Sequence, residues 1–330
     1  MVSSISPRKT FAQSVAGFIL LALFGAALAA LPEFPSKVIN LVVPFPPGGS
    51  LEPVARLMAA KLSQVLGYPV IVVNRVGAAG AIGTASVANG EPDGHTILLN
   101  TGSVSVHPNT YKTPSYDPRT DLTAVSLIAS GPFVLVANRD LPVATVSELL
   151  SYARANPGKL FYGTGGNGSQ LHLLTELLKK AAGIDMIHVP YKGNGPMIAG
   201  LIGGEVQVAF DTIPTSKSLA DAGRVRMFAV TTKTRNAVVP NVPTLAESGL
   251  KGFESGQWQA FFLPRNTPEI VVAKWNKAIL AVLKYPDIKS RLAELGFEVV
   301  GSTPRQLKEQ VESDLITWAE VMRNSKIMVE

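Results

Sequence analysis

Short apolar segments alternate with amphipathic helical patterns along most of the chain, and this alternation limits the possible folds more than any other feature. Residues 38–45 form one apolar segment, as expected of a buried strand. Prolines and glycines follow at 46–49, and apolar residues then recur at helical spacing from Leu51 to Val65. Alternating strands and helices are typical of α/β folds with mostly parallel sheets. Further strands are predicted at 70–73, 96–100, 134–137, 160–162, 206–210 and 227–230.

The chain is predicted to pass twice between two domains. No flexible linker divides it, and turn-forming residues at Gly131-Pro132 and at 252–258 are the best candidates for the boundaries. This places residues 30–132 and 256–330 in a discontinuous first domain and residues 133–255 in a second. A capping box at 303–306 opens the last predicted helix.

The composition excludes several classes of protein. With 330 residues, 46% hydrophobic and 16% charged, the chain can bury a sizeable core. The absence of cysteine excludes a disulfide scaffold, a thiol nucleophile and Cys-ligated zinc, and the 4 histidines lack metal-binding spacing, so no metal and no cofactor is predicted. The net charge of +6 is scattered along the chain. No nucleic-acid partner is therefore expected, whereas a mild positive charge suits anionic small molecules.

The first 29 residues are predicted to be a cleaved signal peptide. Arg8 and Lys9 form a short basic region, residues 15–31 are apolar throughout, and Ala27-Leu28-Ala29 has the small-x-small pattern that signal peptidase cleaves. An uncleaved membrane anchor is the alternative, because a spanning helix needs about 17–25 apolar residues. Cleavage near Ala29 is favoured, and it would deliver the mature protein to the periplasm.

Loops of small polar residues follow four of the predicted strands, at 46–50, 101–105, 163–169 and 211–212. Ligands of open α/β sheets collect at such strand ends. Glycine lets the backbone approach a ligand, Ser50 and Ser169 can cap the following helices, and the free amides of a helix start attract anions. Any one such loop can be an ordinary turn. Two of them leading into helices in different predicted domains favour a clamp for a carboxylate.

Two enzymatic alternatives stay open on this evidence. Residues 163–168 match the dinucleotide-binding pattern G-x-G-x-x-G, although the strand before them is short and carries Tyr162. An exported serine hydrolase could use Ser50 or Ser169 with a histidine, although neither serine lies in a G-x-S-x-G elbow. Neither alternative has a second motif to support it.

His172 and Glu52 each allow two interpretations. His172, in the first turn of the helix after 163–169, either donates to the ligand or supports the loop from behind. Glu52 either forms an ion pair with Arg56, four residues further on, or accepts a hydrogen bond from a polar group of the ligand or from bound water. A carboxylate at an anion site would otherwise repel the anion.

Several blocks of residues occur in a recognisable order between Phe34 and Ile327. They are 43–50 (VPFPPGGS), 74–80 (NRVGAAG), 92–96 (PDGHT), 116–118 (YDP), 156–159 (NPGK), 166–169 (GNGS) with His172, 188–193 (HVPYKG), and 242–244 (VPT) with Glu247. Together these blocks resemble the Bug-type periplasmic solute receptors of tripartite tricarboxylate transporters. Because the likeness covers nearly the whole predicted mature chain, it is more specific than any single motif.

The resemblance implies a two-domain periplasmic binding protein (a type II-like flytrap), with mixed, mostly parallel sheets flanked by helices and a ligand cleft between the domains. It implies no catalysis. The ligand would be a small carboxylate, held partly through ordered water and delivered to the integral membrane permease subunits of the transporter. We expect the receptor to act as a monomer.

The predicted ligand residues come from both domains. Carried over by position from the family, they are Phe45, Gly48, Gly49 and Ser50 in the first domain, and Thr164, Gly165, Gly168, Ser169 and Asp211 in the second. The residues themselves add Glu52, Thr101, Ser103 and His172. Glu52 departs from the resemblance, because the family usually has Asp at this position, and the longer side chain changes the reach into the pocket.

Overall fold

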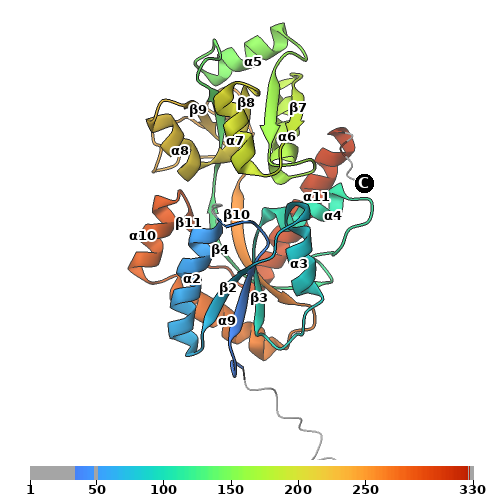
Figure 1. Ribbon diagram of the computed structural model, residues 1–330, viewed down its shortest axis with the longest axis vertical. Coiled ribbons are helices and arrows are strands. Elements are labelled where there is room, and N and C mark those ends of the chain that lie inside the picture. Colours follow the sequence, from blue (N-terminus) through green and yellow to red (C-terminus); the bar gives the residue numbers. More distant parts are fainter. Residues whose placement is uncertain (1–33, 48–50, 326, 328–330) are drawn as a thin grey trace, which may run out of the picture.

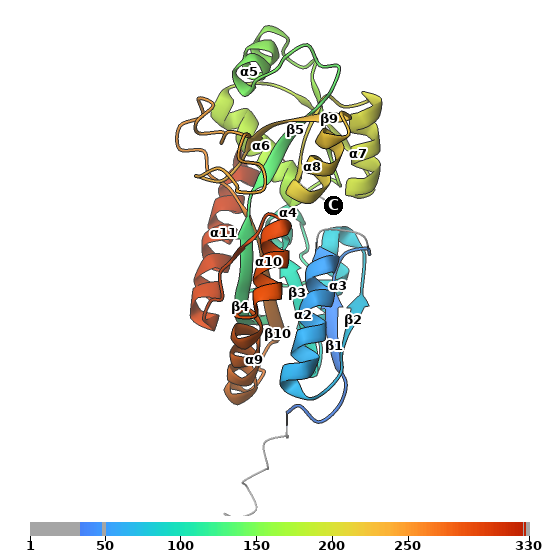
Figure 2. The same ribbon diagram turned by 90° about the vertical axis from the view of Figure 1, so that its left-hand side faces the viewer.

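The computed structural model describes residues 34–47, 51–325 and 327. The predicted signal peptide and the predicted ligand residues Gly48, Gly49 and Ser50 lie outside these described residues. The described chain forms two lobes, one above the other in Figures 1 and 2. Within the described ranges, no helix combines the length and apolar character needed to cross a membrane.

The first lobe, at the bottom of Figure 1, is built on a sheet in the order β11-β4-β10-β3-β1-β2. Its strands are β1 (Ile39–Val43), β2 (Val70–Asn74), β3 (Thr96–Thr101), β4 (Leu122–Gly131), β10 (Gln257–Pro264) and β11 (Glu298–Val299). Its helices are α2 (Leu51–Leu66), α3 (Ala81–Ala88), α4 (His107–Thr110), α9 (Glu269–Val282), α10 (Pro286–Glu294) and α11 (Pro304–Ser325), with 3₁₀ turns η1 (Ala78–Gly80) and η2 (Gly102–Ser105). Helices α2, α9 and α10 share one apolar cluster with the sheet, and α3 and α11 share another.

The second lobe contains a sheet in the order β7-β6-β8-β5-β9. Its strands are β5 (Phe133–Asn138), β6 (Phe161–Thr164), β7 (Ile187–Pro190), β8 (Val208–Thr212) and β9 (Val225–Val230). Its helices are α5 (Val146–Ala155), α6 (Gln170–Ala182), α7 (Asn194–Gly203) and α8 (Ile213–Asp221). Successive residues of β5 alternate between the cluster under α5 and α6 and the cluster under α7 and α8, so both faces of this sheet are buried.

All seven strands predicted from apolar segments are present, as β1, β2, β3, β5, β6, β8 and β9. The prediction of mixed sheets flanked by helices is confirmed, but the pairing is not mostly parallel. Among the described strands, β1–β2, β1–β3, β6–β7 and β6–β8 are parallel, and β3–β10, β4–β10, β4–β11, β5–β8 and β5–β9 are antiparallel. In the first lobe, the antiparallel pairing of β4 with β10 follows from the two passages of the chain between the lobes. β4 leads out of the first lobe and β10 leads back into it, so the two strands run in opposite directions.

The two passages lie close together. β4 ends at Gly131 and β5 begins at Phe133, while β10 begins at Gln257, whose Nε2 donates to the carbonyl oxygen of Pro132 (2.9 Å). In Figure 2, β4 and α11 lie on one side of the molecule, and α2, α3 and α7 lie on the other. The lobes are therefore joined along one side.

Helix α11 adds a third connection by packing. It begins with the predicted capping box, in which the Gln306 amide donates to Oγ1 of Thr303 (3.3 Å) and the Thr303 amide donates to Oε1 of Gln306 (2.9 Å). Its far end carries Trp318, which shares an apolar cluster with Val106 of the first lobe and Leu173 of the second. One helix therefore contacts both lobes.

Candidate ligand site between the two lobes

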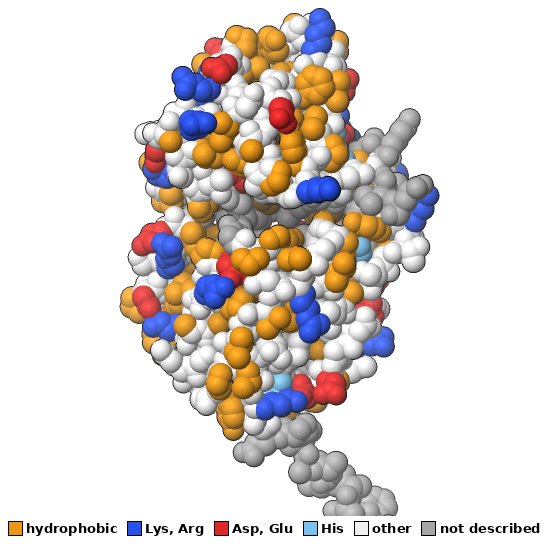
Figure 3. All heavy atoms as spheres, in the orientation of Figure 1, with side chains coloured by type: hydrophobic (Ala, Val, Ile, Leu, Met, Phe, Trp, Pro, Cys, Tyr) orange, Lys and Arg blue, Asp and Glu red, His pale blue; other side chains and the backbone are white. Residues whose placement is uncertain are grey.

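The strand ends that carry the predicted ligand residues face the junction of the lobes. In the first lobe, Thr101 at the end of β3 pairs with Gln259, the third residue of β10 after the crossing. In the second lobe, Thr212 at the end of β8 pairs with Phe133, the first residue of β5. Because β1 is parallel to β3 and β6 is parallel to β8, all four strands end toward the junction. The molecule narrows at this level in Figure 3.

The two lobes touch at Gly102. A Cβ atom on this glycine would lie 2.9 Å from Nε2 of Gln170, at the start of α6, and 3.2 Å from Nε1 of Trp258 on β10. These distances leave no room for a side chain unless the neighbouring groups move. The turn after β3, which carries Thr101 and Ser103, therefore lies against the start of α6, and the structure brings these two predicted loops together.

The hydroxyl groups of Thr101 and Ser103 hold this turn in shape. Oγ1 of Thr101 donates to Oγ of Ser103 (3.0 Å) and accepts from the Ser103 amide (3.3 Å). Oγ of Ser103 in turn donates to Oδ1 of Asn100 (3.1 Å). Both side chains are half-buried, so they remain accessible while the turn fixes their positions.

Asn74 holds Phe45 and Glu52 together. Its Nδ2 donates to the carbonyl oxygen of Phe45 (2.9 Å) and to Oε2 of Glu52 (3.0 Å). Glu52 is buried, and its Oε1 lies 2.5 Å from the guanidinium of Arg56. The predicted ion pair four residues apart is therefore confirmed, and a ligand contact by Phe45 or Glu52 stays a prediction.

The loop between β6 and α6 uses three of its own amides. The Gly166 amide donates to Oγ1 of Thr164 (3.3 Å), and the Ser169 amide donates to the carbonyl oxygen of Gly166 (3.3 Å). The Gly168 amide donates to Nδ1 of His172 (3.1 Å). The bare main-chain nitrogens expected along this loop are therefore engaged within the loop at these three positions.

Two glycines of this loop are required by the fold itself. A Cβ atom on Gly165 would lie 2.5 Å from Oδ1 of Asn194, at the start of α7. Gly168 has a φ of 69°, in the left-handed region that side chains disfavour. Both glycines therefore have a structural reason that is independent of any ligand.

The first turn of α6 supplies the free donors at the junction. Oγ of Ser169 accepts from the His172 amide (3.3 Å), which confirms Ser169 as the predicted helix cap. The first four amides of a helix have no acceptor within the helix, and those of Gln170 and Leu171 have no partner elsewhere in the described part of the chain. Together with the positive end of the helix dipole, these two amides form an anion-binding arrangement.

An aromatic stack lies beside the loop. Tyr162 and His188 are paired on β6 and β7 with ring centroids 5.0 Å apart, and His172 stacks on His188 at 3.7 Å. Nε2 of His188 lies 2.6 Å from Oγ1 of Thr164. Burial lowers the pKa of His172 to about 3 and the pKa of His188 to about 4, so both rings are neutral at pH 7. His172 thus supports the loop through its Nδ1, and its donation to a ligand stays a prediction.

Asp211 is buried at the junction end of β8. Asp211 is only 1% exposed, and its Oδ2 accepts a hydrogen bond from Oγ of Ser216 (3.4 Å). Burial raises the pKa of Asp211 to about 7, although hydrogen bonds from the Thr212 amide and from Ser216 oppose this rise. Asp211 is therefore only partly ionised at neutral pH, and its contact with a ligand stays a prediction.

The sequence analysis missed four residues of the junction. Gln170 and Leu171 follow the predicted cap at Ser169, so the helix-start signal could have pointed to their amides. Trp258 and Gln259 lie on β10, a strand that was not predicted. Gln259 is fully buried, and neither polar atom of its side-chain amide has a partner in the described chain.

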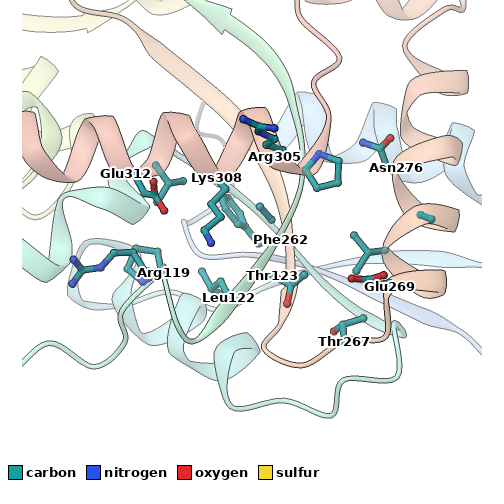
Figure 4. A pocket seen from close by; sticks show the side chains of 16 residues that line it. Arg119, Leu122, Thr123, Phe262, Thr267, Glu269, Asn276, Arg305, Lys308 and Glu312 are labelled. Atoms are coloured by element: carbon teal, nitrogen blue, oxygen red, sulfur yellow. The ribbon is translucent and has the colours of Figure 1, made fainter.

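A separate groove lies at the far end of the first lobe, between α9 and α11 (Figure 4). It has a volume of 670 Å³, with Leu122 and Phe262 among its apolar lining and Lys308 and Glu312 on α11. Leu122 pairs with Pro264, at the opposite end of β4 and β10 from the crossing. The predicted ligand residues that the structure describes do not line it, so this groove is distinct from the junction.

The site does not resemble a catalytic centre. In the described chain, no histidine ring forms a hydrogen bond with Ser169, which removes the support for a serine hydrolase using that residue. Gly165 is packed against the start of α7, which leaves no open glycine turn for a pyrophosphate. Across the described residues, no group of three or more His, Cys, Asp or Glu side chains is placed to hold a metal ion.

Comparison with known proteins identifies relatives of this arrangement. Residues 54–327 match the model of the tripartite tricarboxylate transporter family receptor. The periplasmic binding protein BugD is 35% identical, with a TM-score of 0.82 over 90% of this chain and 100% of its own. The R. palustris protein Rpa4515, solved with adipate, is 38% identical with a TM-score of 0.84, over 90% of this chain and 99% of its own.

A third solved structure has a different ligand. MatC from Rhodopseudomonas palustris, with bound malate, is 33% identical with a TM-score of 0.78, over 87% of this chain and 99% of its own. These matches confirm the periplasmic binding protein fold and the resemblance to the Bug-type receptors. The chain is therefore a member of the tripartite tricarboxylate transporter receptor family, whose members are periplasmic solute-binding proteins and not enzymes.

Proposed function

We propose that the protein captures a small carboxylate between its two lobes and delivers it to the membrane permease of a tripartite tricarboxylate transporter. The observation that carries this proposal is the start of α6, where the amides of Gln170 and Leu171 lack partners in the described chain and lie beside the turn at Gly102. A carboxylate placed there would accept both amides and take up the positive end of the helix dipole.

The donors at hand are sufficient for useful affinity. Hydrogen bonds to a charged group contribute about 1.5–3 kcal/mol each, and micromolar binding needs about 8 kcal/mol. The two free amides of α6 and the hydroxyl of Ser169 come from the second lobe and together contribute about 4.5–9 kcal/mol. In the first lobe, the hydroxyl hydrogens of Thr101 and Ser103 already bond within their turn, so these groups would contact the ligand by exchanging those bonds. A ligand that contacts both sets would hold the lobes together, which favours closure on binding.

The relatives support a dicarboxylate. Rpa4515 was solved with adipate and MatC with malate, and both of these molecules carry two carboxylates. In the proposed complex one carboxylate occupies the start of α6. The second faces the first lobe, where Phe45, Gly48, Gly49, Ser50 and Glu52 are predicted ligand residues.

The family also suggests where the protein works and how its domains are divided. We infer that residues 1–29 are a signal peptide cleaved near Ala29 and that the mature receptor works in the periplasm as a monomer. Its two domains would comprise residues 30–132 with 256–330 and residues 133–255, and they would close about the crossing at Pro132. The crossings on one side of the molecule support such a motion.

Thermal shift and calorimetry with adipate and malate test this function. A receptor gains stability with ligand by RT ln(1 + [L]/Kd), about 2.7 kcal/mol at a hundredfold excess over Kd. Adipamide, which has the shape of adipate without its charges, is the matched control and should give no shift. A panel of other small mono- and dicarboxylates extends the search. The proposal is wrong if no carboxylate in this panel stabilises the protein, or if adipamide binds as well as adipate.

A further inference from the structure

Two histidines hold the loop that precedes α6 from its two ends. His172 comes from α6 and is 4% exposed, and His188 comes from β7 and is half-buried. Their ring centroids are 3.7 Å apart with an interplanar angle of 19°, so the rings are stacked face to face.

Each ring contacts a different part of the loop. Nδ1 of His172 accepts the Gly168 amide at 3.1 Å, so in the neutral ring the proton sits on Nε2. Oγ1 of Thr164 donates to the carbonyl oxygen of Gly166 (3.0 Å) and accepts the Gly166 amide (3.3 Å), so Nε2 of His188, 2.6 Å away, donates to this oxygen. The pair therefore supports the loop at Thr164, where β6 ends, and at Gly168, shortly before α6 begins.

The surroundings of the pair favour uncharged rings. Tyr162 stacks on His188, and its hydroxyl donates to Oε1 of Glu176 at 2.6 Å. Nζ of Lys179 lies 2.7 Å from the same Oε1 and neutralises this carboxylate. Burial and Lys179 lower the pKa of both histidines, while Glu176 opposes this effect at His188.

We propose that His172 and His188 are positioning residues, which as a stacked neutral pair hold the loop before α6 in its ligand-binding shape, and that protonation of His172 releases the loop. This inference rests on the proposed function, because the loop matters to a ligand only if the start of α6 holds that ligand. The pair would make capture of the carboxylate dependent on pH. It adds His188, which is not among the predicted ligand residues.

The chemistry of the two rings explains the release. A protonated His172 has no acceptor at Nδ1, so the Gly168 amide would lose its partner and face an N–H group instead. Two charged rings at 3.7 Å would also repel each other. Protonation of His172 therefore removes the support of the loop at Gly168, and protonation of both rings also disfavours the stack.

Conservative variants separate the hydrogen bond from the bulk of the ring. Oδ1 of asparagine can occupy the place of Nδ1, and the amide of glutamine can occupy the place of Nε2. His172→Asn and His188→Gln thus keep a partner for the loop without a titratable group. His172→Phe and His188→Phe keep a stacked ring without the hydrogen bond.

Amide hydrogen exchange followed by NMR measures the loop without any ligand. At pH 7, His172→Phe should lower the protection of the Gly168 amide by about tenfold, the effect of losing one hydrogen bond, whereas His172→Asn should restore it to within about threefold of the wild type. At the Gly166 amide, which donates to Thr164, His188→Phe should lower the protection by less than this, and His188→Gln should restore it, because His188 acts on this amide only through Thr164. The Leu245 amide, which donates to Val230 in the second lobe, is the control for global unfolding.

The ring nitrogens and the pH profile complete the test. In the wild type, ¹⁵N shifts should place the His172 proton on Nε2. Lowering the pH from 7 to 3 should reduce the protection of the Gly168 amide by about twofold relative to Leu245, because His172 titrates near pH 3 and is then half protonated. The variant with His172→Asn and His188→Gln together should lack this relative loss.

Calorimetry with adipate and malate connects the loop to the ligand. The acid loss of affinity should be steeper in the wild type than in the double variant, because the ligand's own protonation affects both proteins equally. Equal protection of Gly168 in His172→Phe and the wild type, or a pH profile unchanged in the double variant, would overturn the inference. Failure of both ligands to bind at pH 7 would count against the proposed ligands alone, because the exchange data still decide the role of the histidines.

Discussion

Gly102 of the first lobe lies against Gln170 of the second lobe. It has no positive φ that would itself require glycine, so a side chain here is limited by its neighbours across the junction. Gln170 can rotate away from a small group, whereas the indole of Trp258 is held by a hydrogen bond of 2.7 Å to Oδ2 of Asp314. A larger side chain would therefore act as a wedge between the lobes.

Replacing Gly102 with leucine should keep the lobes apart. We expect Gly102→Leu to weaken adipate or malate binding by about tenfold or more, which corresponds to a loss of at least about 1.4 kcal/mol of closure. Small-angle scattering should show a larger radius of gyration with ligand than the wild type has. Gly195→Leu, on α7 where a Cβ has no neighbour within 4 Å, is the control. Unchanged scattering and affinity in Gly102→Leu would contradict the wedge.

Asp211 should make the protein less stable as the pH rises. Burial raises its folded-state pKa from 3.8 to about 7, so the folded protein favours the protonated carboxyl. Its stabilising contribution is fully present below pH 3.8, declines as the pH rises toward 7, and is lost above that. Asp211→Asn, which cannot ionise, should therefore raise the free energy of unfolding at pH 8 by up to about 4 kcal/mol.

Chemical denaturation at pH 4 and pH 8 measures this effect. The variant and the wild type should differ little at pH 4, where Asp211 is protonated in the folded state. The gain should appear only at the higher pH. A variant that is less stable than the wild type at pH 8 would show that the ionised carboxylate has a partner that compensates for its burial.

At the scale of elements, α6 carries the largest part of the proposed ligand site. Its cap, its first-turn amides and His172 all lie within its first turn or immediately before it. The cap and the ligand therefore depend on the same few residues. Substitutions at Ser169 can separate the two roles, because Asn and Asp cap helices about as well as Ser.

Ser169→Asp should keep the helix and lose the ligand. A carboxylate at the cap preserves helix stability and interacts well with the dipole, but it repels the carboxylate of a ligand. We expect its free energy of unfolding to stay within about 0.5 kcal/mol of the wild type, with binding weakened at least about tenfold. Ser169→Asn is the neutral control and should bind, and Ser169→Ala should lose about 1 kcal/mol of stability. Equal binding by the Asp and Asn variants would place the anion elsewhere.

The elements were largely predictable where apolar periodicity is continuous. All seven strands predicted from apolar segments are present, and so are α2, α6 and the capped start of α11. β4 and β10 were not predicted, because polar residues such as Ser126 and Gln259 interrupt their apolar sequences while tertiary pairing buries them. Which strands pair across the crossing is a long-range property that local patterns do not contain.

The site was predictable as a place but only partly in its chemistry. The loops at 101–105 and 163–169 do meet at the junction, as the carboxyl-end rule indicates. Glycine content alone could not reveal that the Gly168 amide is taken by His172. The stacking of His188 depends on its register opposite Tyr162 in a parallel pair, which the sequence does not specify.

At the scale of the whole molecule, α11 links the lobes. Trp318 is 4% exposed and packs with Val106 of the first lobe and Leu173 of the second. Its Nε1 is buried without a hydrogen-bond partner in the described chain. The side chain therefore contributes through packing, and it couples the stability of one lobe to that of the other.

Trp318→Ala should uncouple the lobes. Removing a buried tryptophan costs about 3–5 kcal/mol, and here the lost contacts join the two halves. We expect one unfolding transition for the wild type and two for Trp318→Ala in differential scanning calorimetry. Trp318→Phe, which keeps most of the apolar area and removes the unpaired N–H, should retain a single transition within about 1 kcal/mol of the wild type. A single transition in Trp318→Ala would mean that the strand crossings couple the lobes without α11.

The position of the connections on one side of the molecule has a practical consequence. A small rotation of one lobe about that side becomes a large displacement at the opposite side, where α3 and α7 lie in Figure 2. Since the chain contains no cysteine, thiols introduced at Ile82, which is 57% exposed, and at Gly195 would be its sole labelling points. Dyes at these two places would turn the protein into an optical sensor for the metabolite it carries.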